Sequence, residues 1–314
     1  MTIVEPPDPL FLGCPAPQRT RFSGYALRVI VGAGLSALTT LSFTARAEAP
    51  VPKNVPLKWQ LTWSDEFNGT SGSSPDPGKW TFDQGGDGNG NHELQSYTIR
   101  PVNVQQKAGN LVITAAKEDY TGADRIPRSY TSARIKTHGL FSQAYGRFEA
   151  RVQLPLGKGI WPAFWMLGND IDTVGWPKCG EIDIFENIGE ARISHSTLHG
   201  PGYSGAKAIS AKYALTFGKR VNTAFHLYAL EWAPNDIKFF LDDRLVVERT
   251  PADLPPGTKW VYDHPFFVLL NLAVGGDWPG NPNGTTVFPQ RMLVDYVRVY
   301  RRSDSGTGTR SHHP

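Results

Sequence analysis

The segment "GEIDIFENIG", residues 180–189, places three carboxylates at offsets of zero, two and five along one apparent β-strand. Side chains of a strand alternate between its two faces, so Glu181 and Asp183 share a face while Glu186 falls on the other. A β-bulge between Asp183 and Glu186 would reset this alternation and return Glu186 to the face of the other two acids. We therefore predict a bulged strand that carries all three carboxylates on one surface.

Several other segments have strand patterns. Residues 147–154, "RFEARVQL", alternate apolar and polar side chains, which predicts a strand with one buried and one wet face. The pattern of residues 225–249 predicts three short strands, broken at Pro234-Asn235-Asp236 and at the Asp242-Asp243 turn. Residues 266–276 form a continuous apolar run suited to burial on both faces. Residues 292–300, "MLVDYVRVY", predict a closing strand. The fold class is therefore all-β, a sandwich or jelly roll of antiparallel strands.

The composition supports this fold class and one large domain. The 314 residues include 32 Gly and 25 Pro, which implies many turns, and 40% hydrophobic residues can supply a sizeable core. Residues 1–47 resemble an export leader, with arginines around an apolar stretch and Ala-Arg-Ala at its end; a membrane anchor is the alternative. We expect a Pro-rich linker at 48–56, one domain at 57–302 and a disordered tail at 303–314.

Charge and cysteine content exclude some functions. The whole chain has a formal charge of +3; residues 1–47 contain four arginines and two acids, so the remainder has a formal charge of +1. This balance gives no electrostatic basis for nucleic-acid binding. After removal of the leader Cys179 is the remaining cysteine, so an internal disulfide is not possible.

The acid cluster suits glycoside hydrolysis, which needs two carboxyl groups beside the scissile bond. In a retaining mechanism, Glu181 would attack the anomeric carbon and Glu186 would act as acid/base, while Asp183 would hydrogen-bond to the nucleophile and tune it. Crowding of three acids raises the pKa of at least one of them. From spacing alone, a solvated acidic strand or a calcium site remains an alternative.

The chain resembles glycoside hydrolase family 16 in several segments that follow in the family's order. "GEIDIFENIG" is similar to the bulged active-site strand of its laminarinase-like β-1,3-glucanase branch. The other matching segments are "LTWSDEFNG" (61–69), "GNGNHELQSYT" (88–98), "GIWPAFWMLG" (159–168), "HSTLHGPGYSG" (195–205), "NLAVGGDWPG" (271–280) and "VDYVRVY" (294–300). The resemblance implies a concanavalin A-like β-jelly roll of two antiparallel sheets with a concave substrate cleft.

Candidate substrate-binding residues come partly from chemistry and partly from this resemblance. An aromatic ring offers a flat apolar face to a pyranose, which favours Trp161, Trp165 and the loop residue Trp278; core packing is the alternative for Trp161 and Trp165. The resemblance places His199 near the nucleophile, with a structural hydrogen-bonding histidine as the alternative. It also implies contacts of Asn91 and Arg134 with sugar hydroxyls; for Asn91, which lies in a Gly/Asn-rich loop, simple turn chemistry is the alternative.

No cofactor is expected for the chemistry, but the resemblance implies a structural Ca²⁺ on the convex side. Its ligands would be Glu66, Asp295 and the backbone carbonyl of Gly109, since calcium prefers oxygen donors. Exposed acids at strand ends are the alternative interpretation of this set.

These observations together predict a secreted or periplasmic retaining endo-β-1,3-glucanase that cleaves laminarin-type glucans. The expected partner is a β-glucan, with no nucleic acid and no stable membrane association after leader cleavage, and we expect a monomer. Alternatives within the family are a mixed-linkage β-glucanase and an agar or carrageenan hydrolase. An alternative of another class is a non-catalytic β-glucan-binding protein, against which the presence of all three acids argues.

Overall fold

The computed structural model describes residues 59–216 and 218–303, all within the unit Pro52–Pro314. The predicted leader (1–47) and linker (48–56), and the tail after Ser303, lie outside the described residues, so these boundaries stay predictions. Within the described residues, no helix is long and apolar enough to cross a membrane.

Two β-sheets pack face to face. The larger has ten strands: β1 (Trp59–Asp65), β3 (Gln95–Tyr97), β4 (Val104–Gln106), β5 (Leu111–Thr121), β6 (Pro127–Ser132), β8 (Gly146–Gln153), β13 (His226–Ala233), β14 (Asp236–Leu241), β15 (Arg244–Arg249) and β17 (Gln290–Arg302). The smaller has seven: β2 (Thr81–Asp83), β7 (Arg134–Lys136), β9 (Ile160–Gly168), β10 (Glu181–Glu186), β11 (Ile193–His199), β12 (Ile209–Ala214) and β16 (Phe266–Val274). Helical turns are short: α1 (Ile171–Val174) and the 3₁₀ segments η1 (Gly205–Lys207) and η2 (Pro251–Asp253).

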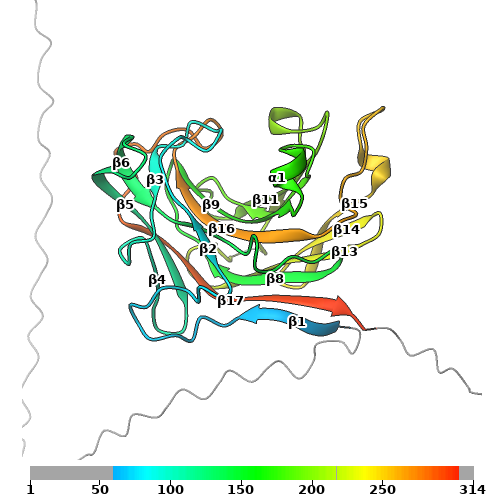
Figure 1. Cartoon of the computed structure of the whole chain (residues 1–314), viewed down its shortest axis with the longest axis horizontal. Helices are drawn as coiled ribbons and strands as arrows, with labels where there is room; N and C mark the ends of the chain where they lie inside the picture. Colours follow the sequence, from blue (N-terminus) through cyan, green and yellow to red (C-terminus); the bar gives the residue numbers. More distant parts are fainter. Residues whose placement is uncertain (1–58, 217, 304–314) are drawn as a thin grey trace, which may run out of the picture. The chain divides into compact units, whose positions relative to one another are not determined.

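The strand order explains the layered shape. The small sheet runs β12-β11-β10-β9-β16-β7-β2 and the main path of the large sheet runs β15-β14-β13-β8-β17-β5-β6-β3. Strand pairs are antiparallel except β3 with β6. Figure 1 shows two curved layers, with β9, β11 and β16 in the inner layer and β8, β13 and β17 in the outer one. This architecture confirms the predicted jelly-roll sandwich.

The core lies between the sheets and follows the sequence patterns. β16 is buried along its whole length, as the continuous apolar run predicted. β13, β14 and β15 are the three predicted short strands, and Asp242 and Asp243 both have positive φ in the turn between β14 and β15.

The predicted wet face of β8 is wrong in part. Arg147 and Glu149 point away from the core yet are 9% and 7% exposed. They are covered because Arg147 bonds to Glu149 at 2.7 Å and also to Glu231 and Asp243 from the adjoining strands and turn. Ion pairing therefore lets charged side chains be buried on this outer face.

The bulge that the acid spacing predicted is confirmed. Asp183 is opposite Trp165 and Phe185 is opposite Phe164, so Ile184 is an extra residue in β10 relative to β9. Ile184 and Phe185 are both buried in the core. The bulge therefore leaves the next residue, Glu186, on the same face as Asp183. This face of the seven-stranded sheet, turned away from the core, is called the free face below.

Candidate active site

The free face of the seven-stranded sheet carries the acids in register with polar, aromatic and aliphatic side chains. Three rows cross the sheet there: Leu167, Glu181 and His199; Trp165, Asp183 and Thr197; and Asp83, Arg134, Asn271, Ala163, Glu186 and His195. Figure 1 places this sheet on the inner, concave side of the sandwich. The sheet register thus brings together residues from six strands that are far apart in the sequence.

Glu181 accepts a hydrogen bond from a tryptophan that precedes it in a loop. The Nε1–H of Trp176 donates to Oε2 of Glu181 at 2.5 Å, although the Trp176 side chain itself is 49% exposed. An indole can only donate, so this contact stabilises the ionised form of the carboxylate. Burial, followed by repulsion from Asp183, raises the pKa of Glu181 to about 8.

His199 directs a proton toward the acids. Its Nδ1 accepts the backbone N–H of Gly205 at 3.1 Å, so Nε2 carries the hydrogen in the neutral ring. Nε2 lies 3.2 Å from Oδ2 of Asp183 and 3.9 Å from Oε1 of Glu181. The structure therefore places His199 beside both carboxyl groups, near Glu181 as the family resemblance implied.

Asp183 is the most deeply buried of the three acids, at 2% exposure. Its Oδ2 has no hydrogen-bond partner, because the nearby Nε2 of His199 lies outside hydrogen-bond geometry. Burial, followed by repulsion from Glu186, raises the pKa of Asp183 well above its usual range. The neighbouring Glu181 carboxyl group acts to lower the pKa of Asp183, while Asp183 acts to raise that of Glu181, so the two groups can share a proton.

Glu186 is held at both oxygens by side chains from the strands on either side. Trp161 on β9 donates its Nε1–H to Oε1 at 3.0 Å, and Thr197 on β11 donates its hydroxyl to Oε2 at 3.4 Å. Burial is the main reason that the pKa of Glu186 rises to about 7, and the charge of Glu181 adds to it. A carboxyl group with this pKa can exchange a proton near neutral pH.

Trp161, Trp165 and Trp278 lie near the acids, and their contact with substrate stays a prediction. Trp161 and Trp165 both lie on the face of β9 opposite the core residues Phe164 and Met166, and Trp165 also packs against a small apolar cluster of Leu167, Cys179, Phe267 and Leu269. Trp278 is 41% exposed and meets the ring of Trp161 edge to face at 5.7 Å. These rings can present apolar surface to a pyranose next to Glu186.

An amide and arginine network continues the site along the Glu186 row. Asn271 accepts the Trp165 Nε1–H at 2.7 Å and donates to the Tyr97 hydroxyl at 3.1 Å. The guanidinium of Arg134 lies 5.0 Å from the centre of the Tyr97 ring and bonds to Asp83 at 2.5 Å. Arg134 therefore has a fixed position on the free face of the sheet, with two strands, β9 and β16, between it and Glu186.

Asn91 joins this network through a buried acid. Its Nδ2 donates to Oε1 of Glu93 at 3.4 Å, and Tyr97 and Gln95 donate to Oε2 of the same carboxylate. Burial raises the pKa of Glu93. The backbone carbonyl of Asn91 also accepts the N–H of Asp277, which fixes the Asn91 loop against the segment that carries Trp278.

The predicted calcium ligands are occupied by arginines. Arg298 donates to both oxygens of Glu66 at 2.9 and 2.8 Å, and Arg151 donates to Asp295 at 2.6 Å. As placed, these carboxylates do not fit a free calcium ligand set with the Gly109 carbonyl, because a cation there would compete with two guanidinium groups. Calcium at this position stays a prediction.

Within the described residues, Glu181, Asp183 and His199 form a group whose donor atoms lie within 4.8 Å of one another, close enough to hold a metal ion. The same side chains account for a proton-transfer site without one.

Five residues of this site were not predicted from the sequence. They are Trp176, Thr197, Tyr97, Asn271 and Glu93, the last as the acid that joins Asn91 to Tyr97 and Gln95. Trp176 had a usable signal, since it is a tryptophan in a Gly/Pro loop like Trp278, only five residues before Glu181. The other four give no such signal, because their roles depend on strand register.

Two glutamates on one face of a strand, each accepting a hydrogen bond from an indole and with pKa values raised to about 8 and about 7, indicate a glycoside hydrolase. Comparisons with known proteins agree with this class. Residues 91–298 match the family model "Glycosyl hydrolases family 16". A beta-glucanase of Rhodothermus marinus is 44% identical over 256 residues, which cover 77% of this chain and 85% of that protein.

Solved structures extend the match to the fold. The laminarinase catalytic domain of Thermotoga maritima is 45% identical with a TM-score of 0.74, covering 79% of this chain and 100% of that one. The endo-β-1,3-glucanase of Pyrococcus furiosus is 47% identical with a TM-score of 0.74, covering 78% and 95%. The chain belongs to glycosyl hydrolases family 16, which confirms the resemblance seen in the sequence.

Proposed function

We propose that this protein is a retaining endo-β-1,3-glucanase that cleaves laminarin-type glucans, with Glu181 as nucleophile and Glu186 as acid/base. The observation that carries this proposal is the bulge at Ile184, which puts both glutamates on the free face of β10. The similarity to laminarinases and endo-β-1,3-glucanases supports the substrate.

The hydrogen bonds around the two glutamates support their different roles. Taken singly, the pKa values of about 8 for Glu181 and about 7 for Glu186 would leave the proton on Glu181. The three acids share their protons as one cluster, so we assign the negative charge from the hydrogen-bond donors around each carboxyl group. Glu181 receives the shorter donor, 2.5 Å from Trp176, and has the Nε2–H of His199 nearby. Glu186 receives longer donors, at 3.0 and 3.4 Å. Charge-assisted hydrogen bonds are the shorter ones, which favours the carboxylate at Glu181 and the acid at Glu186.

The proposed reaction uses two displacements. Glu181 attacks the anomeric carbon while Glu186 donates its proton to the leaving glycosidic oxygen, which gives a covalent glycosyl-enzyme. Glu186, now a carboxylate, removes a proton from water, and the water attacks the same carbon and releases Glu181. Asp183, when protonated, limits the repulsion of charges within the cluster.

The surroundings of the acids suit a neutral sugar chain. Trp161, Trp165 and Trp278 supply ring faces, and Asn271 and Arg134 supply amide and guanidinium donors along the same row. We also propose, from the leader-like residues 1–47, that the protein acts outside the cytoplasm, and that it works as a monomer without a catalytic cofactor.

Reducing-sugar release on laminarin, lichenan, agarose and carrageenan tests the function. We expect the highest rate on laminarin, and first products that keep the β-configuration when followed by proton NMR. Glu181→Gln should abolish turnover, whereas Glu118→Gln, the same change on the β5 strand of the other sheet, should not. Binding of laminarin without hydrolysis by the unmodified protein would instead favour a glucan-binding protein, and a higher rate on lichenan would favour mixed-linkage glucan.

A further inference from the structure

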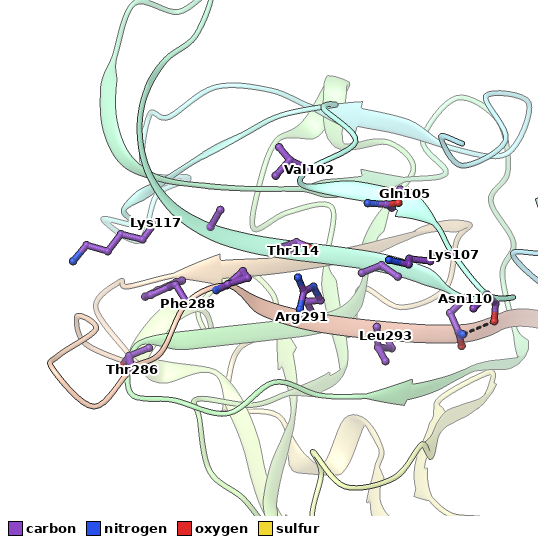
Figure 2. A pocket seen from close by; sticks show the side chains of 14 residues that line it. Val102, Gln105, Lys107, Asn110, Thr114, Lys117, Thr286, Phe288, Arg291 and Leu293 are labelled. Atoms are coloured by element: carbon purple, nitrogen blue, oxygen red, sulfur yellow. Dashed lines mark hydrogen bonds between the residues drawn. The ribbon is translucent and has the colours of Figure 1, made fainter. Parts of the chain in front are cut away.

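A second site candidate lies on the other side of the sandwich. An open groove of about 880 Å³ runs over β4, β5 and β17 of the ten-stranded sheet (Figure 2). Its floor residues Val112 and Thr114 alternate along β5 with the core residues Leu111, Ile113 and Ala115. The groove is therefore on the outward face of this sheet, whereas the acids are on the free face of the other sheet.

Strand register builds the floor of the groove. Gln105 on β4 is opposite Val112 on β5, and Val112 is opposite Leu293 on β17. The next row pairs Thr114 with Arg291. The floor therefore alternates aliphatic surface with amide, hydroxyl and guanidinium groups.

The charged side chains that line the groove are all positive. Its lining includes Lys107, Lys117 and Arg291, and no acidic residue lines it. Within residues 59–216 and 218–303, none of these three side chains forms an ion pair. Glu118, which follows Lys117, is paired with Arg100 at 2.5 Å and so does not neutralise it. The formal net charge of the whole 314-residue chain is only +3, so the three cations of the groove are a local concentration of positive charge.

The three cations are spread along a line. Figure 2 shows Lys107 near one end, Lys117 near the other and Arg291 between them. Along β5, the seven steps from Asn110, beside Lys107, to Lys117 correspond to roughly 23 Å at about 3.3 Å per residue. A single phosphate or carboxylate could meet one of these cations, while a chain with repeated anionic groups could meet all three.

We propose that this groove binds a linear acidic polysaccharide. The cations would pair with its carboxylate or sulfate groups, and Gln105, Asn110 and Thr114 would hydrogen-bond to its hydroxyl groups. Phe288, packed against Tyr130 at 5.1 Å, adds an aromatic surface at one wall. Proteins bind single-stranded nucleic acid with several aromatic rings on which the bases stack. Phe288 is the single aromatic residue that lines this groove, which argues against a nucleic acid as its ligand.

The site would hold the protein on an acidic matrix while the opposite face remains open to glucan. This inference rests on the groove and its charges and is independent of the proposed glucanase activity. It therefore survives or fails separately from that activity.

Affinity electrophoresis of the full chain in gels that contain polygalacturonate tests the proposal. We expect retardation relative to a gel with neutral dextran, and loss of retardation as salt is added. The triple variant Lys107→Glu, Lys117→Glu and Arg291→Glu should bind polygalacturonate at least ten-fold more weakly. A matched variant with Arg125→Glu, Lys207→Glu and Lys259→Glu changes three exposed cations outside the groove by the same charge and should keep its retardation.

Three results would overturn the proposal: no retardation of the unmodified protein, equal loss in both triple variants, or stronger binding to single-stranded DNA or anionic lipid vesicles than to polygalacturonate. Unchanged circular dichroism and melting temperature would show that the variants are folded. Laminarin hydrolysis, if present in the unmodified protein, should be unchanged in the groove variant, which separates the two sites.

Discussion

Glu181→Gln should stabilise the protein at alkaline pH, because the active-site carboxylate opposes folding when it is charged. Burial raises the pKa of Glu181 from its usual 4.5 to about 8 in the folded protein. A difference of one in pKa corresponds to about 1.4 kcal/mol, so ionised Glu181 lowers the free energy of unfolding by up to about 5 kcal/mol. Asp183 and Glu186 share the same protons, so we expect a measured gain of about 2–5 kcal/mol.

The sign of the effect depends on pH. Below 4.5 the carboxyl group is protonated in both the folded and the unfolded state, and the substitution should change stability little. As pH rises from 4.5 to about 8, the unfolded state loses the proton first, so the stability of the unmodified protein falls. Glutamine has no such proton to lose, and its Oε1 can still accept the Trp176 Nε1–H.

Urea unfolding at about pH 4 and about pH 9 measures this difference. Glu118→Gln is a control of opposite sign, since the hydrogen bond from Arg100 lowers the pKa of Glu118. That variant should lose stability at the higher pH and recover it as the pH falls through the folded-state pKa. An equal effect of Glu181→Gln at both pH values, or destabilisation at about pH 9, would refute the account of the buried acid cluster.

Other substitutions test individual contacts. Trp176→Phe removes a hydrogen-bond donor to charged Glu181, and such a bond is worth roughly 1.5–3 kcal/mol. The acidic limb of the kcat/KM pH profile should therefore move up by about 1–2 in pH. The same shift in Trp278→Phe would argue against a specific role of the Trp176 N–H. Glu186→Ala should be reactivated by azide to give a β-glycosyl azide, whereas Glu181→Ala with azide should give the α-anomer; the reverse pattern in product NMR would exchange the two roles. Asn271→Ala leaves the partners of its amide unpaired, so stability should fall by about 1–3 kcal/mol and KM should rise more than kcat falls; a fall in kcat alone would place Asn271 in the chemical step instead.

Local patterns in the sequence were sufficient to predict the fold class and the bulge. The offset of five between Glu181 and Glu186 can put both on one face only if an extra residue intervenes, and Ile184 is that residue. The two adjacent apolar residues Ile184 and Phe185 fill the core at this point. This part of the site is encoded within six residues.

Contacts between distant segments could not be predicted in the same way. The burial of Arg147 depends on Glu231 and Asp243, about 84 and 96 residues further along the chain. The tautomer of His199 depends on the backbone N–H of Gly205, and the indole donor to Glu181 depends on the path of the loop after α1. Sequence periodicity identifies which face of a strand a residue is on, but not which residues of other strands lie beside it.

The central claim, that Glu181 is the nucleophile of a retaining enzyme, is tested most directly by trapping the covalent intermediate. Incubation with a 2-deoxy-2-fluoro β-glucosyl or laminaribiosyl fluoride, followed by proteolysis and mass spectrometry, locates the sugar on the chain. We predict a single adduct on Glu181 that forms as activity is lost. An adduct on Glu186, or an active enzyme that releases inverted product and forms no adduct, would contradict the account.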